Sequence, residues 1–193
     1  IGLIFGYIVY ESMLDWILDS IDWVLNNTDK TILIRQHPAE RGKQIDNTDT
    51  YKEKIESKFG INKRIIFIDA RQDINSYDLI ENALCVLGFS STIIVESVML
   101  GKPAIIISNA YFSNFGIAYN ASDKKEYYMY LLKSSKKELK ITEEMKNRAC
   151  ISNYLTQTCN LYRTEFTPVR TNFLKWSELS IEDLERDYLP IQA

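Results

Sequence analysis

The sequence is poor in histidine and cysteine and has no strong excess of either charge. Its only histidine is His37, and its three cysteines, Cys85, Cys150 and Cys159, show no metal-ligand spacing, so no metal site is predicted. An odd number of cysteines argues against a disulfide framework and favours a reducing, cytoplasmic location. The net charge of -3 and the lack of a basic stripe argue against a nucleic-acid partner.

No apolar run reaches the about 18 to 20 residues that a membrane-spanning helix needs. The apolar opening, residues 1–9, lacks the flanking features of a signal peptide and is interpreted as either a first buried strand or the lead-in to a helix. Because the sequence does not begin with methionine, we expect it to be a piece of a longer protein. Its aromatic and amphipathic flanks permit peripheral attachment at the inner face of a membrane without requiring it.

The organising stretch is residues 84–107, LCVLGFSSTIIVESVMLGKPAIII. It predicts an apolar strand, a turn, a short helix that carries Glu96, and a second apolar strand after a Gly-Lys-Pro stop. Because both strands are nearly continuous apolar runs, each is expected to be covered on both faces, as in parallel sheets flanked by helices. The predicted fold class is therefore α/β, a Rossmann-like open and mostly parallel sheet with helices on both faces.

Hydrophobic periodicity and turn residues predict the remaining elements. Helices are expected over residues 10–26, 51–59, 77–82 and 123–133 and again from Thr142, with strands over 31–35 and 64–68. Residues 108–122 are rich in aromatics, Asn and Ser, which suits a ligand-covering loop or, equally, packing over the sheet edge. We assign residues 1–165 to the Rossmann-like domain and 166–193 to a helical tail.

The turn from Gly88 to Ser91 follows a predicted strand and precedes a helix, where ligands of open α/β sheets bind. Unpaired N–H groups and the helix dipole favour an anion there, and the hydroxyls of Ser90 and Ser91 add donors for phosphate oxygens. Serine also caps helices often, so a plain cap is the alternative. Glu96 lies in an otherwise apolar helix and needs a partner, either a ribose hydroxyl pair or a neighbouring Lys or Arg.

His37 stands at the end of the strand predicted over residues 31–35, because Pro38 favours an extended conformation there and ends the strand. A lone histidine is more often structural, but at this rim an imidazole can donate a hydrogen bond to phosphate or supply a proton to a leaving group. Arg35 is expected to point to the same side of the strand as His37.

The loop after the strand over residues 64–68 contains Asp69 and Asp73, and Asn75 or Ser76 is expected to cap the helix that follows. The functional interpretation is that the backbone of this loop walls a nucleobase. For Asp73 and Asp78 the alternative is favourable electrostatics at a helix end.

Together, His37-Pro38, the Asp-rich loop, Ser90-Ser91, Glu96 and Gly101-Lys102-Pro103 resemble the nucleotide-sugar-binding half of GT-B glycosyltransferases. The resemblance covers residues 31–107 and is nearest to bacterial capsule and surface-polysaccharide enzymes, including Kdo transferases and sialyltransferases with HP and SS motifs. It implies transfer from a nucleotide-sugar donor, mostly a CMP-activated acidic sugar, to a glycan acceptor, with no separate cofactor. Preorganised donors would stabilise the departing phosphate without requiring a metal.

The resemblance implies a catalytic or phosphate-binding role for His37 and ribose or base contacts from Glu96, Asp69 and Asp73. The expected phosphate-binding positions are Arg35, Pro38, Gly88, Ser90, Ser91 and Thr92. Enzymes of this type have a second, N-terminal domain that usually supplies the base and the acceptor site. We therefore expect this chain alone to bind nucleotide weakly or not at all and to turn nothing over.

Other interpretations stay open at this point. CDP-glycerol-type glycerophosphotransferases and nucleotide-sugar 2-epimerases use similar folds, although Ser90-Ser91-Thr92 replaces the Ser-Gly-Gly expected of the epimerases. A noncatalytic α/β binding module is the alternative from another class. The transferase hypothesis requires the three strand-end turns to converge at one rim of a single sheet.

Overall fold

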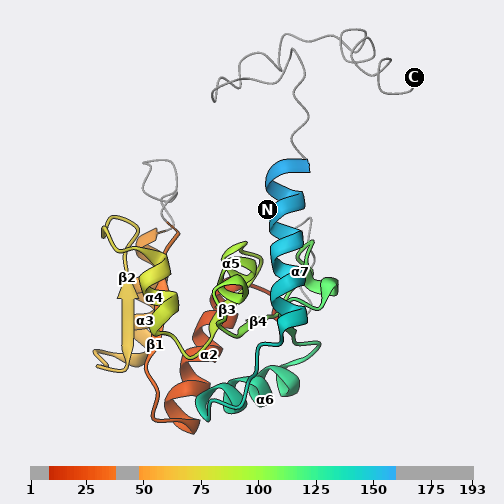
Figure 1. Cartoon of the computed structure of the whole chain (residues 1–193). Coiled ribbons are helices and arrows are strands. Elements are labelled where there is room, and N and C mark those ends of the chain that lie inside the picture. The colour runs from red at the N-terminus through yellow and green to blue at the C-terminus, as the bar shows by residue number, and fades with distance from the viewer. Residues whose placement is uncertain (1–8, 38–47, 160–193) are drawn as a thin grey trace, which may run out of the picture. The chain divides into compact units, whose positions relative to one another are not determined.

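The computed structural model describes residues 9–37 and 48–159 (Figure 1). Clustering of contacts divides the chain into two compact units, Ile1–Ser152 and Asn153–Ala193. The predictions for residues 1–8, for Pro38, for most of the loop over 39–50 and for the tail over 166–193 lie outside the described residues. The features that follow belong to the first unit unless stated otherwise.

The described elements alternate between helices and short strands, as predicted. In chain order they are α2 (Met13–Asn27), β1 (Ile32–Arg35), α3 (Thr48–Phe59), β2 (Ile65–Ile68), α4 (Ser76–Asn82), β3 (Val86–Gly88), α5 (Ile93–Met99), β4 (Ala104–Ile106), β5 (Tyr119–Asn120), α6 (Lys124–Ser135) and α7 (Glu143–Tyr154). A 3-10 turn, η2 (Ser113–Phe115), precedes β5, and a π-helical turn, η3 (Leu155–Cys159), follows α7 in the second unit.

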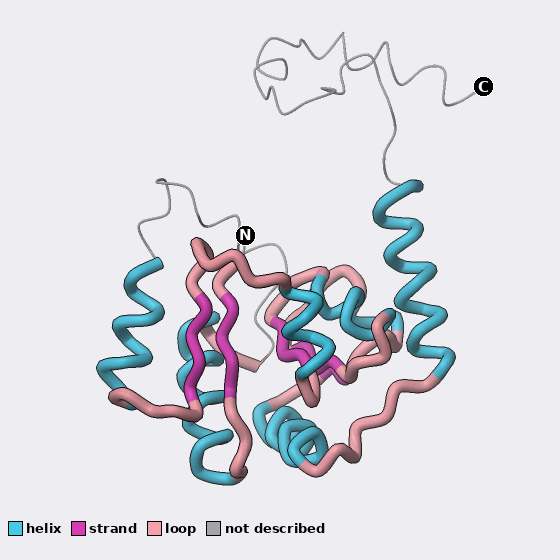
Figure 2. Tube along the Cα trace, turned by 60° about the vertical axis from the view of Figure 1, so that its left-hand side comes forward, coloured by secondary structure: helices cyan, strands magenta, loops and turns pink. Residues whose placement is uncertain are grey.

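The strands are all parallel but form two open sheets where a single sheet was expected. β1 pairs with β2, with Ile34 opposite Phe67, and β3, β4 and β5 pair in that order. Figure 2 shows β1 and β2 as a pair apart from the other strands. The interpretation of residues 1–9 as a strand or a helix lead-in lies, apart from Val9, outside the described residues.

β4 confirms the prediction of a strand covered on both faces. Ala104 and Ile106 belong to a buried cluster with α5 and α7, whereas Ile105 and Ile107 belong to a second cluster that includes side chains of α6 and packs against α2. Alternate residues of a strand point to opposite faces, so helices cover this strand on both sides. The chain is therefore an open α/β fold of the Rossmann-like type.

Residues 108–122 pack against the sheet edge and contribute a strand to it, so the alternative of edge packing is the one that the structure supports. Tyr119 and Asn120 form β5, which pairs in parallel with β4. Phe112 and Ile117 are fully buried in the cluster on the α5 side. This aromatic segment forms part of the core because the edge of β4 offers both hydrogen-bonding groups and an apolar face.

Local capping signals set several element ends. The side chain of Asn75 accepts a hydrogen bond from Tyr77 N at the start of α4, and Asp123 accepts one from Glu126 N at the start of α6. Both caps satisfy backbone donors that the first helical turn leaves unpaired. Gly101, which ends the α5 region, has φ +78°, a conformation that side-chain-bearing residues rarely adopt.

Arg64, just before β2, ties the end of α2 to the start of the β1–β2 sheet. Its guanidinium donates to the carbonyl oxygens of Val24, Leu25, Thr28 and Lys30 at 2.6 to 3.2 Å. Val24 and Leu25 belong to the last turn of α2, and Val24 O also accepts a hydrogen bond from Thr28 N. A single planar cation therefore links the end of α2 to the residues just before β1.

Candidate functional site

Arg35 is the last residue of β1, and its side chain reaches across to the loop after β2, residues 69–75. Nη1 donates to Asp69 O at 2.8 Å, and Nη2 donates to Ile74 O at 3.2 Å and, more weakly, to Gln72 O at 3.5 Å. The guanidinium therefore holds three carbonyls of this loop in place. Sequence reasoning assigned Arg35 to phosphate. In the structure its two terminal nitrogens bind protein carbonyls.

Gln36 supplies a second connection between the end of β1 and the same loop. Its side chain is buried, and Oε1 accepts a hydrogen bond from Ala70 N at 3.0 Å. The pairing of β1 with β2 also extends past the strands, since Gln36 N donates to Ile68 O. Sequence reasoning passed over Gln36, which shows no pattern beyond its position before His37.

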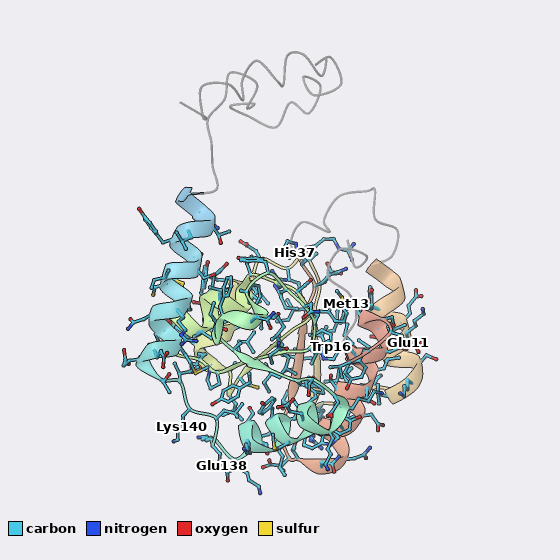
Figure 3. The ribbon with its side chains drawn as sticks, turned by 90° about the vertical axis from the view of Figure 1, so that its right-hand side faces the viewer. Glu11, Met13, Trp16, His37, Glu138 and Lys140 are labelled. Carbon is cyan, nitrogen blue, oxygen red and sulfur yellow. The ribbon has the colours of Figure 1, made fainter. Side chains whose placement is uncertain are left out.

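His37 follows directly and is exposed. In Figure 3 it lies toward the top of the view, whereas Glu138 and Lys140, in the connection between α6 and α7, lie toward the bottom. His37 follows the last residue of β1, Arg35, by two positions. That placement agrees with the strand-end position predicted from the following proline.

The two aspartates predicted for the ribose or base differ in their surroundings. Asp69 accepts hydrogen bonds from the backbone N and the guanidinium of Arg71 at 2.8 to 3.0 Å. These bonds hold the pKa of the Asp69 carboxyl well below its usual range, so it stays ionised and engaged within the loop. Asp73 is exposed. The loop is thus ordered by its own hydrogen bonds and by Arg35.

Gly88 ends β3 and is buried, and its role is close packing. A Cβ atom at this position would lie 2.5 Å from both Cδ1 and Cγ1 of Ile94 in α5. Glycine therefore allows α5 to pack against the end of β3 at a distance that any other residue would prevent. This contact sets where the helix begins relative to the strand.

The turn between β3 and α5 presents three hydroxyls. Ser91 and Thr92 are exposed and Ser90 is partly buried. Thr92, the N-cap, makes no side-chain cap hydrogen bond, and Ser91 Oγ accepts from Ile93 N over a long 3.4 Å. The plain serine cap therefore accounts for little of this turn, because its only contact is near the limit of hydrogen-bond geometry.

Glu96 has a partner that sequence reasoning did not anticipate. Tyr77 Oη, from the first turn of α4, donates to Glu96 Oε2 at 2.7 Å. No Lys or Arg within the described ranges forms an ion pair with Glu96, so the expected alternative of a cationic neighbour is not what the structure shows. The sequence offered one signal for this partner. A cap at Asn75 fixes the start of α4 and therefore places Tyr77 in its first turn.

These contacts form a continuous chain from β1 to α5. Arg35 binds the loop after β2, that loop leads into the Asn75 cap, and the capped helix presents Tyr77 to Glu96. The ends of β1 and β2 and the helix after β3 are therefore linked by side-chain contacts even though β1 and β3 do not share a sheet. Chemically, the linked groups are a guanidinium, a phenol and a carboxylate.

Buried serines brace the carboxyl ends of β3 and β4. The Ser108 hydroxyl donates a short hydrogen bond to Phe89 O, and Ser113 Oγ donates to Ser108 O at 2.8 Å. Both serines are buried. Sequence reasoning included them only in a general Ser-rich segment, because nothing in the local pattern shows which hydroxyl will face a carbonyl.

The described part of the chain holds neither a helix suited to span a membrane nor a cluster of metal-ligating side chains. None of its helices is both long and apolar enough to cross a membrane. Within the same residues no group of three or more His, Cys, Asp or Glu side chains is arranged to hold a metal ion.

Comparison with known proteins gives one family. The model of the family described as "Capsule polysaccharide biosynthesis protein" matches residues 6–154. That range is more than half of the 193 residues and includes every strand described above as well as the Tyr77–Glu96 pair. No curated protein and no solved structure is significantly similar to the chain.

Proposed function

Since the chain belongs to the capsule polysaccharide biosynthesis protein family over residues 6–154, we propose that it is the donor-binding domain of a glycosyltransferase. The donor is a nucleotide sugar, with a CMP-linked acidic sugar as the preferred class, and the acceptor is a surface or capsular polysaccharide. The observation that carries the proposal is the chain of contacts from Arg35 to Glu96. It supports the proposal because it links the end of β1 and the loop after β2 to Glu96 in α5, and ligands of open α/β sheets bind beyond the carboxyl ends of the strands.

Each group has a defined task in this proposal. His37 donates a hydrogen bond to the donor's phosphate or protonates the departing nucleotide. The hydroxyls of Ser90, Ser91 and Thr92 add donors at the start of α5. Sugar transfer separates charge as the glycosidic bond breaks, so preorganised donors at the phosphate lower the barrier for departure.

The remaining residues hold the nucleoside and the loops around it. Glu96 accepts hydrogen bonds from the ribose, and the loop after β2 lies against the base. Arg35 contributes by bracing that loop through the carbonyls of Asp69 and Ile74. Gly88 contributes by letting α5 approach the strand end. A loop held in advance loses less conformational entropy when the ligand binds.

The catalytic base and the acceptor site are assigned to a further domain. The described residues in this proposal contact the donor only, so the isolated chain binds nucleotide weakly and transfers no sugar. Robust transferase activity of the 193-residue chain alone would contradict this division of labour.

Because weak affinity is expected, the test is titration of the isotopically labelled chain with CMP, CDP, UDP and GDP at millimolar concentration, followed by NMR. His37 is the only histidine, so its imidazole signals report on the site without ambiguity. We expect CMP to shift the signals of His37 and of the amides in the loop after β2 and the turn before α5. Shifts spread over the surface, or none at these positions, would overturn the proposal.

Variants assign the response to the site. H37A and S91A should each weaken CMP binding several-fold. The matched control is S135A, which also removes one serine hydroxyl but lies at the end of α6, where it donates to Leu132 O. A preference for UDP would instead favour a 2-epimerase-like or hexosyl-transfer function, and a preference for CDP would favour glycerophosphotransfer.

A further inference from the structure

Tyr77 has no role in the function proposed so far, yet its phenol donates a side-chain hydrogen bond to Glu96. The phenol is about half exposed, with 49% of its surface accessible, and its oxygen lies 2.7 Å from Glu96 Oε2. This hydrogen bond raises the pKa of the Tyr77 phenol, since the bond favours the protonated form beside a carboxylate. Tyr77 is therefore a hydrogen-bond donor to Glu96 throughout the neutral range.

Other contacts fix the backbone positions of both Tyr77 and Glu96. Tyr77 N donates to the Asn75 side chain at 2.9 Å, and the loop before Asn75 is braced by Arg35 through Ile74 O. Glu96 lies on a helix whose neighbours Val95 and Ser97 are buried, and Gly88 sets the depth of that helix. The hydrogen bond therefore joins two side chains whose backbones are already fixed.

A carboxylate can accept about four hydrogen bonds, two on each oxygen. Tyr77 occupies one acceptor position on Oε2. Among the described residues no second hydrogen bond to the Glu96 carboxylate is found, so Oε1 and the second position on Oε2 can accept from a ligand, and the phenol restrains the orientation of the group. Two neighbouring hydroxyls, such as the vicinal pair of a ribose, match two acceptor positions on one carboxylate.

We propose that Tyr77 is a positioning residue that orients Glu96 toward the 2′- and 3′-hydroxyls of the nucleotide ribose. This inference rests on the proposed function and adds to it a determinant of specificity for ribonucleotides over deoxyribonucleotides. If Tyr77 served only as a structural contact between α4 and α5, its loss would change the affinity for every ligand by the same factor. A positioning residue affects each ligand according to how many of the two hydroxyls it carries.

The test compares CMP with 2′-deoxy-CMP and 3′-deoxy-CMP, with dissociation constants taken from NMR titrations of the full chain. We expect the wild-type chain to bind CMP about tenfold more tightly than either deoxy analogue, as for loss of one hydrogen bond to a charged group. Y77F should weaken CMP binding several-fold and should weaken binding of each analogue, which keeps one of the two hydroxyls, by a smaller factor. The preference for ribose would then fall in the variant.

Two further variants complete the design. E96Q should abolish the preference, because the amide offers fewer acceptor positions. Y119F is the matched control: it also removes a phenol hydroxyl from a hydrogen bond, in this case to Lys140 O at 2.8 Å, and should leave the preference intact. Thermal unfolding of each variant shows how much stability it has lost.

The outcomes separate this inference from the function on which it rests. If no nucleotide binds the wild-type chain, both are overturned. If CMP and its deoxy analogues bind the wild-type chain equally, the ribose role of Glu96 and Tyr77 is overturned while nucleotide binding stands. If Y77F weakens all three ligands by one factor, or leaves the preference unchanged, Tyr77 is only a structural contact.

Discussion

The two sheets of this protein are stabilised by different interactions. In the β3–β4–β5 sheet, Ile105 and Ile106 are fully buried between helices. In the β1–β2 sheet, Leu33 and Ile66 lie opposite each other and are 40% and 44% exposed. The β3–β4–β5 sheet therefore depends on apolar burial on both faces, whereas the β1–β2 sheet has one face that is incompletely covered.

Arginine side chains supply what the β1–β2 sheet lacks in burial. Arg64 binds carbonyls at the amino end of this sheet, and Arg35 binds carbonyls of the loop at its carboxyl end. Hydrogen bonds are directional and apolar contacts are not, so arginines define the position of a loop more closely than packing would. In the β1–β2 sheet, which leads to His37, arginine hydrogen bonds fix the positions of the adjoining loops. In the β3–β4–β5 sheet, apolar burial supplies most of the stability.

The largest test of this difference is truncation in the buried strand. I106A should lower the free energy of unfolding by about 2–5 kcal/mol, because it leaves a cavity between β4 and the helices around it. L33A, in the exposed position of β1, should cost far less. Chemical denaturation of both variants measures the difference, and equal losses would show that the two sheets are stabilised alike.

The second test concerns the arginine that ties α2 to the β1–β2 sheet. R64M should lower the free energy of unfolding by roughly 1.5–3 kcal/mol, as expected when carbonyls lose a charged donor. Hydrogen exchange should accelerate in β1 and β2 more than in β4. K63M, which removes the neighbouring exposed cation, is the control, and a similar loss in that variant would refute the role of Arg64.

The third test uses pH to probe burial on the β3–β4 side. Burial raises the pKa of the Cys85 thiol from 9.0 to about 11. Its contribution to stability is thus complete below pH 9.0 and is lost as pH rises toward about 11, with a slope of at most about 1.4 kcal/mol per pH unit. Thermal unfolding of the wild-type chain and of C85A, each normalised to pH 7, should diverge over that interval. Parallel curves would show that the thiol is not protected.

The smallest effect is expected on the exposed face of the β1–β2 sheet. The double variant L33T/I66T should change the free energy of unfolding by about 1 kcal/mol at most, because the two residues keep 40% and 44% of their surface exposed in the folded state. Threonine keeps the preference for a strand at both positions. A loss of several kcal/mol in denaturation would mean that this face is covered and that the comparison of the two sheets is wrong.

Local sequence signals predicted most of the secondary structure. The Asn75 and Asp123 caps act on neighbouring backbone groups, so their effects could be read from short segments. The strand-end position of His37 followed from the proline after it. In contrast, β5 was missed because two residues carry no strand pattern, and their pairing depends on the edge of β4.

The candidate site was predictable only as a set of positions. From the sequence, Glu96 was expected to need a partner. The structure supplies Tyr77, which lies nineteen residues away on another helix, α4. Arg35 was expected to face a phosphate, and the structure directs its terminal nitrogens to loop carbonyls. These are long-range contacts, and no local pattern specifies them.

The sequence by itself determined the order of strands and helices, the apolar runs that become buried strands and the polar residues at the strand ends. Each depends on interactions within a few residues, chiefly the spacing of apolar side chains and the capping of helix ends. Only the tertiary structure decided that the described strands form two sheets and that Arg35, Tyr77 and Glu96 connect their ends. Such contacts form between distant segments, and their partners are set by how helices pack on the sheets.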